Sequence, residues 1–155
     1  MSKKKNRDRV EKSATQFPFP TYMTEKHHAV SVKLFSNYSD LTHNAKLIGY
    51  NVNDKENGIC LPCFIADIVR HDLQCHRSHH PPAYNNRVSE LLEELEQKSL
   101  TYCSKNKQVV LKQKLENIAR RTMTNIENWV PGWYLRSNAQ KEREDSYANA
   151  NLPMP

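Results

Sequence analysis

The sequence predicts a small α+β domain in which a β-hairpin is followed by helices. Three observations lead to this fold class. Segment 29–35 is β-branched and alternating, which favours a strand, with a short helix as the alternative. Asn57-Gly58 is the dipeptide that favours a two-residue hairpin turn. From Pro82 onward, apolar residues recur with the spacing of amphipathic helices.

A first helix is expected over 41–49, where Ser39-Asp40 can cap its start and Gly49 can end it. A second begins at Pro81-Pro82, because the first turn of a helix does not use its N–H donors. A third covers about 105–128 and is broken by Pro131-Gly132. The apolar positions of the three helices are Leu41, Ala45, Ile48, Val88, Leu91, Leu92, Leu95, Val109, Leu111, Leu115, Ile118, Met123 and Ile126. After the third helix, Trp129, Trp133 and Tyr134 are expected to pack back on the core, whereas the run 59–69 has no assignment.

The chain of 155 residues is long enough for one domain with tails. Five of the first nine residues are Lys or Arg, so residues 1–16 are expected to form a disordered basic arm. Residues 17–100 are predicted to form the core and 101–136 a helical extension of the same domain. The polar residues 137–155 are predicted to be a loose tail.

The formal net charge is +6, which favours a polyanionic partner such as nucleic acid. No apolar run reaches the roughly 18 residues that a membrane span needs. The basic N-terminus has no apolar stretch behind it, so a cleaved secretory signal is not expected. Four cysteines in a chain of this length do not form a dense disulfide framework.

Five of the seven histidines fall in two clusters, His27-His28 and His76-Arg77-Ser78-His79-His80. Imidazole ligates metals and titrates near neutral pH. Phosphodiester hydrolysis needs a base for the attacking water and positive charge on the phosphate and leaving oxygen. The clusters therefore indicate a metal-dependent site that cuts phosphodiester bonds.

Neighbouring residues of a strand point to opposite faces, so His27 and His28 can take different roles. His76 and His80 are four residues apart, the spacing that places two ligands on one helical face. Because Pro81 disturbs helix at His80, His79 or Asn85 is the alternative ligand. Three imidazoles favour zinc, nickel or cobalt, and magnesium becomes plausible if an asparagine and waters complete the set.

Three motifs carry a family resemblance: Lys26-His27-His28, the stretch 53–62 (NDKENGICLP), and His76-x3-His80-x3-Tyr84-Asn85-x2-Val88. In order and spacing they resemble the AHH nucleases, a branch of the HNH/endonuclease VII superfamily. The resemblance covers roughly 22–96. The sequence departs from the family in having Lys26 where alanine is expected, and in a longer stretch over 63–75.

The resemblance implies a His-Me finger core (ββα-metal, treble-clef-like) with additional helices. A hairpin would carry His27, His28 and Asn57, and the following helix would supply His80. It also implies His28 as general base with Asn57 as its catalytic partner, and a divalent ion on His27, His76 and His80. The reverse roles of His27 and His28 stay open, because strand alternation does not say which face is which.

Basic side chains near these motifs are the candidates for phosphate contacts. They are Lys26, Arg77 and Arg87, with Lys33 and the basic arm as further cations. Tyr84 is a further candidate, which contacts phosphate, orients a ligand or is a packed aromatic. Such contacts give affinity without base readout. DNA is the expected substrate, and RNA is the alternative.

AHH domains are common as the toxic ends of bacterial polymorphic toxins and secretion effectors. The resemblance therefore implies an antibacterial toxin, such as a type VI secretion effector, with a cognate immunity protein more acidic than itself. It would be made in the cytoplasm, exported without a cleaved signal and active in the cytoplasm of the target cell. A non-toxin nuclease and a non-catalytic zinc-binding nucleic-acid module are the alternatives.

A second, structural zinc site is possible at Cys60, Cys63, Cys75 and His79, whose spacing is C-x2-C-x11-C-x3-H. The alternative is that these cysteines are small core residues. Cys103 belongs to neither group. His43 and His71 are expected to be ordinary surface or core histidines.

Overall fold

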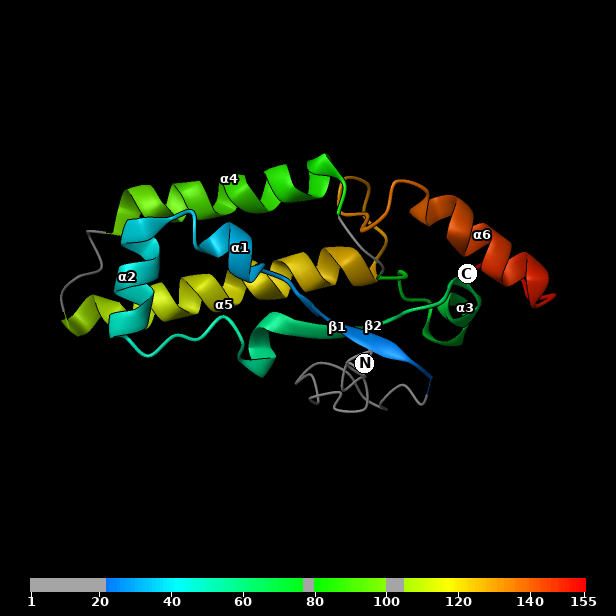
Figure 1. The fold of residues 1–155 in the computed structure, drawn as a ribbon, viewed down its shortest axis with the longest axis horizontal. Coiled ribbons are helices and arrows are strands. Elements are labelled where there is room, and N and C mark those ends of the chain that lie inside the picture. Colours follow the sequence, from blue (N-terminus) through cyan, green and yellow to red (C-terminus); the bar gives the residue numbers. More distant parts are fainter. Residues whose placement is uncertain (1–21, 77–79, 100–104) are drawn as a thin grey trace, which may run out of the picture.

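The computed structural model describes residues 22–76, 80–99 and 105–155, with the side chains of 105–108 left aside. The arm 1–16 therefore lies outside the described residues. A two-stranded sheet packs beside two long helices, with shorter helices at both ends (Figure 1). The elements are β1 Thr24–His28, α1 Val32–Phe35, α2 Ser39–Leu47, a 3-10 helix Lys55–Asn57, β2 Gly58–Pro62, a 3-10 helix Ile65–Asp67, α3 Ile68–His71, α4 Pro82–Ser99, α5 Lys105–Glu127 and α6 Ala139–Asn149.

The hairpin joins two segments that are far apart in the sequence. β1 pairs antiparallel with β2, and His27 lies opposite Ile59 and His28 opposite Gly58. The prediction of a tight turn at Asn57-Gly58 is wrong. Asn57 ends a 3-10 helix and Gly58 is extended at φ −129°, so the pair begins β2 and two helices fill the connection between the strands.

The prediction of a strand over 29–35 is also wrong. The alternative, a short helix, is correct for the second half of this segment. The strand lies just before this segment, and α1 occupies Val32–Phe35. The Ser31 hydroxyl accepts a hydrogen bond from the Leu34 N–H and so caps α1. Ala29 and Val30 are completely buried where the chain leaves β1, which explains their apolar character without a strand.

Helix α2 confirms the first predicted helix, but its cap differs from the prediction. Ser39 and Asp40 lie inside the helix and do not cap it. The carboxylate of Glu96 on α4 instead accepts hydrogen bonds from the N–H groups of Asp40 (3.2 Å) and Leu41 (2.6 Å). Gly49 follows the helix at φ +76°, the left-handed conformation that ends helices. A tertiary contact thus replaces the local cap.

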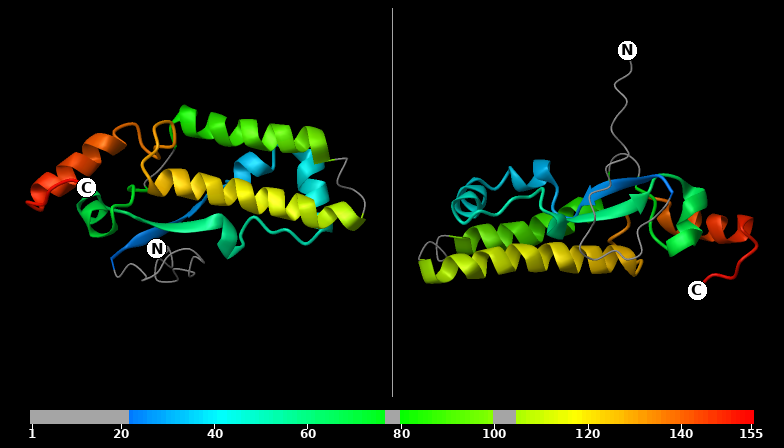
Figure 2. Two further views of the ribbon diagram at one scale, coloured as in Figure 1. Left: turned by 180° about the vertical axis from the view of Figure 1, so that it is seen from behind. Right: turned by 90° about the horizontal axis from the view of Figure 1, so that it is seen from below.

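The long helices α4 and α5 confirm the two helices predicted after Pro82, and they run antiparallel (Figures 1 and 2). Their inner faces form the main core with the hairpin, as completely buried Ile59, Leu92 and Leu115 illustrate. Val109 was expected on that face but is 63% exposed. Among the described helices, none is sufficiently long and apolar to cross a membrane.

The segment from Ser137 was predicted to be loose, and the structure differs: α6 covers Ala139–Asn149 and packs against α3. Its partners come from elsewhere in the chain, which is why its own polar sequence did not predict it. Arg143 forms a two-pronged ion pair with Asp72 (2.8 and 2.6 Å) and stacks on Trp129. Trp129 and Trp133 are buried, and Tyr134 packs against the cluster that contains Trp129, so all three pack on the core as predicted.

Candidate metal centre

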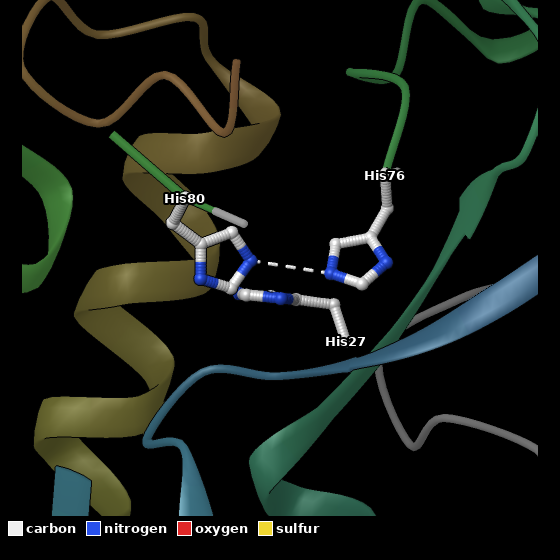
Figure 3. A group of neighbouring side chains, drawn as sticks. All are labelled: His27, His76 and His80. Atoms are coloured by element: carbon white, nitrogen blue, oxygen red, sulfur yellow. Dashed lines mark hydrogen bonds between the residues drawn. The ribbon is translucent and has the colours of Figure 1, made fainter. Parts of the chain in front are cut away.

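Three imidazoles converge where β1 approaches the start of α4 (Figure 3). His27 comes from β1, whereas His76 and His80 flank residues 77–79. One nitrogen from each ring lies within 4.8 Å of the others, and the Nε2 atoms of His76 and His80 are 3.2 Å apart. Two nitrogens at about 2.0–2.1 Å from a tetrahedral metal are about 3.3 Å apart, so this spacing suits two ligands of one ion.

The protonation of these rings also fits a metal. His27 is 1% exposed, and burial lowers the pKa of its imidazole well below 6.5, with the neighbouring His76, His80 and His28 adding to the effect. Burial lowers the pKa of His76 as well, against the opposing influence of Glu25. Neutral imidazoles keep a free lone pair, which a metal ion needs. Within the described residues, His27, His76 and His80 form the group of at least three potential ligands that could hold a metal ion.

The segment that carries His76 is held by buried contacts. The His76 N–H donates to the Pro62 carbonyl at the end of β2 (2.9 Å), and its Nδ1 lies 3.3 Å from the Glu25 carboxylate. The buried Gln74 side chain donates to the carbonyls of Ile126 and Trp133. These contacts fix the loop between the hairpin and α5, so His76 faces His27 without lying in a helix.

The helical reasoning for His76 and His80 is therefore wrong, although the two residues do meet. Neither is helical, because α4 begins only at Pro82. Their rings nevertheless lie close together, with centroids 5.3 Å apart. The alternative ligand His79 and the phosphate candidate Arg77 lie outside the described residues, and Asn85 lies in the first turn of α4.

His28 points away from these three rings. Its Nε2 lies 3.0 Å from Oδ1 of Asn53, and both residues line an open hollow of about 900 Å³. The hollow is lined by Lys26, His28, Asn51, Asn53, Asp54, Lys55, Glu56, Lys112 and Glu116. A histidine that meets solvent one residue from the buried His27 is placed to exchange protons with a water molecule.

Asn53 makes the hydrogen bond that we expected from Asn57. Asn57 is 2% exposed, and its side chain bonds the Val30 N–H, the Val30 carbonyl and the Val52 carbonyl at 2.8–2.9 Å. It therefore ties the end of β1 to the start of β2. The sequence shows both asparagines in one turn-forming stretch, and nothing in their local pattern distinguishes the two roles.

The basic candidates lie in different places. Lys26 lines the hollow beside His28, and its Nζ donates to the Asn53 carbonyl. Arg87 lies against Gly132 on another side of α4, where a side chain at position 132 would meet its guanidinium. Tyr84 is buried, and its hydroxyl contacts His27 and Ala29, so it is not placed to touch a phosphate. Lys33 is exposed on α1.

The cysteines do not assemble a second metal site within the described residues. Cys60, Cys63 and Cys75 are buried, and they do not belong to the described group of close potential ligands. Cys75 packs with Ile68 and Trp129 in a small apolar cluster. His79, the fourth expected ligand, and Cys103 lie outside the described residues. His43 and His71 are both exposed, as expected of ordinary surface histidines.

The β-hairpin with paired histidines, the two further histidines and the following helix are consistent with the fold of the His-Me finger nucleases. The family model of the AHH nucleases, "a nuclease family of the HNH/ENDO VII superfamily with conserved AHH", matches residues 9–122. The chain belongs to this family and is a hydrolase. No curated protein matches the chain. No solved structure matches it either.

Proposed function

We propose that the protein is a metal-dependent endonuclease that hydrolyses DNA, with His28 as its general base. The observation that carries the proposal is the division of the His27-His28 pair. His27 is buried and lies with the partly buried His76 and His80, whereas His28 faces the open hollow on the other side of β1. This arrangement supports His27 as the ligand and His28 as the base, and disfavours the reverse.

The contact with Asn53 suggests which nitrogen of His28 acts. Amide Oδ1 only accepts hydrogen bonds, so the Nε2 atom of His28 carries a hydrogen and its Nδ1 is free. The free Nδ1 can take a proton from the attacking water. A divalent ion on His27, His76 and His80 would neutralise charge on the phosphate and stabilise the leaving oxygen. Zinc, nickel and magnesium are the candidate ions.

DNA is the substrate that we propose, because the charge favours a nucleic acid. The net charge is +6, and Lys26, Lys55 and Lys112 line the hollow that contains His28, together with Asp54, Glu56 and Glu116. Phosphate contacts of this kind give affinity without base readout. RNA offers the same phosphates, so the substrate assay includes both.

The biological role that we propose is an antibacterial toxin that is exported to a target cell and has a cognate immunity protein. The support is the resemblance to the AHH domains of polymorphic toxins. Expression in the cytoplasm of a sensitive bacterium is expected to stop growth and degrade the chromosome. Growth unaffected by the active enzyme would contradict the role and favour a non-toxin nuclease.

The deciding experiment is plasmid cleavage by the purified protein, first in EDTA and then with magnesium, manganese, nickel or zinc restored. We expect metal-dependent nicking that His28→Ala lowers roughly 100-fold or more, because a positioned general base contributes about that much. His43→Ala is the matched control, since His43 is exposed on α2, and it is expected to cleave normally. If DNA stays intact with every metal while zinc binds, the DNase assignment fails and an RNase or a non-catalytic zinc module replaces it.

A further inference from the structure

The buried hydroxyl of Tyr84 connects the candidate metal centre to the backbone. Oη of Tyr84 lies 2.8 Å from Nε2 of His27 and 3.1 Å from the carbonyl oxygen of Ala29. The Tyr84 side chain is 2% exposed, so water does not compete for these contacts. Its ring also packs against His80 and Trp133, with centroids 4.9 and 6.0 Å apart.

The number of available hydrogens determines the direction of both hydrogen bonds. A tyrosine hydroxyl has one hydrogen to donate, whereas a carbonyl oxygen only accepts. The Tyr84 hydrogen therefore goes to Ala29, and Tyr84 accepts a second hydrogen bond from His27. It follows that Nε2 of His27 carries the ring hydrogen. The nitrogen of His27 that keeps its lone pair is then Nδ1.

The same reasoning gives the opposite nitrogen for His76. Its Nδ1 lies 3.3 Å from the Glu25 carboxylate, which only accepts, so its free lone pair is on Nε2. That atom is the one that approaches Nε2 of His80 at 3.2 Å. His27 and His76 therefore present different nitrogens to the centre of the group.

We propose that Tyr84 is a positioning residue that holds His27 in the tautomer that binds the metal through Nδ1, while His76 binds through Nε2. This inference rests on the metal centre of the proposed function. Partners of this kind, which hold the second nitrogen of a ligating histidine, orient the ring and tune its basicity. Tyr84 also links His27 to Ala29, the residue directly after His28, so one hydroxyl holds the ligand and the exit of the strand that carries the base.

The first test uses the unaltered protein. Long-range ¹H–¹⁵N correlation spectra of the histidine rings, recorded without metal and then with zinc added, report which nitrogen is protonated and which binds. We expect His27 to have a protonated Nε2 in both states, and zinc to shift its Nδ1. A zinc-induced shift at Nε2 of His27 would overturn the proposal. This measurement needs neither a variant nor cleavage.

The second test is Tyr84→Phe, which removes only the hydroxyl. We expect zinc affinity to fall about 10- to 100-fold, the usual effect of losing such a partner. The control is Tyr38→Phe, because the Tyr38 hydroxyl donates to the Ser89 carbonyl at 3.0 Å. That variant removes a hydrogen bond from a tyrosine hydroxyl to the backbone of α4, the helix that carries Tyr84, without touching a ligand. It is expected to bind zinc normally.

The outcomes separate this proposal from the nuclease itself. Equal zinc affinity in Tyr84→Phe and the unaltered protein would refute the role of Tyr84, even if DNA cleavage is observed. Weaker zinc binding with an altered His27 tautomer would support that role, even if no nucleic acid is cut. If Tyr84→Phe does not fold, the ring spectra of the unaltered protein still decide.

Discussion

At the scale of single residues, burial divides the chemistry of two neighbouring histidines. His27 is almost completely buried among other imidazoles, whereas His28 meets the solvent-filled hollow and Asn53. Desolvation penalises the charged form of His27, so this ring stays neutral and suited to a metal. One step along a strand is sufficient for this difference, because successive side chains point to opposite faces.

The lowered pKa of His27 predicts how stability without metal depends on pH. In the unfolded chain a histidine titrates near 6.5, whereas in the folded protein the pKa of His27 is well below this value. Below about pH 6.5 the unfolded chain binds a proton that folded His27 does not, so the free energy of unfolding falls as the pH falls. The slope approaches about 1.4 kcal/mol per pH unit for each such group.

Urea denaturation in EDTA at pH 7.5, 6.5 and 5.5 checks this prediction. His76 also has a lowered pKa and contributes in the same direction. The comparison is His27→Gln, which removes one of the two groups and is expected to weaken the pH dependence. An identical slope in that variant would show that His27 does not carry the effect.

At the scale of elements, Asn57 joins the two strands that carry the histidines. Its amide satisfies three backbone groups, the Val30 N–H and the carbonyls of Val30 and Val52. Buried groups that lose their partner cost about 1–3 kcal/mol each. We therefore expect Asn57→Ala to lower the free energy of unfolding by roughly 2–4 kcal/mol, measured by urea denaturation.

Asn53→Ala is the matched comparison for that variant. Asn53 is exposed and bonds the ring of His28, so its loss is expected to leave stability nearly unchanged and to slow cleavage. If both variants lose stability equally, the division between a structural and a positioning asparagine is wrong.

At the scale of the whole molecule, charge is distributed over two faces of α5. Lys112 lines the hollow with His28, whereas Lys114 lines a separate groove of about 510 Å³ between α4 and α5. Only the first hollow contains the candidate base. The net charge of +6 therefore does not act at a single surface.

This distribution predicts the salt dependence of DNA binding. Each phosphate contact contributes about −0.9 to the slope of log affinity against log salt concentration on duplex DNA. With EDTA present to prevent cleavage, we expect Lys112→Gln to make the slope shallower by about 0.9. Lys114→Gln is expected to leave it unchanged. The slopes can be measured by fluorescence anisotropy, and an equal effect of the two substitutions would place the DNA elsewhere.

The sequence by itself determined the family, the order of the histidine motifs and the helices α2, α4 and α5. Helical periodicity and end signals are local, so they can be read along the chain. The tertiary structure alone decided the pairing of β1 with β2, the cap that Glu96 provides and the docking of α6. It also brought His76 to His80 without a helix and gave Asn53 the contact expected of Asn57. These features depend on burial and on partners distant in the chain, which the spacing of neighbouring residues does not encode.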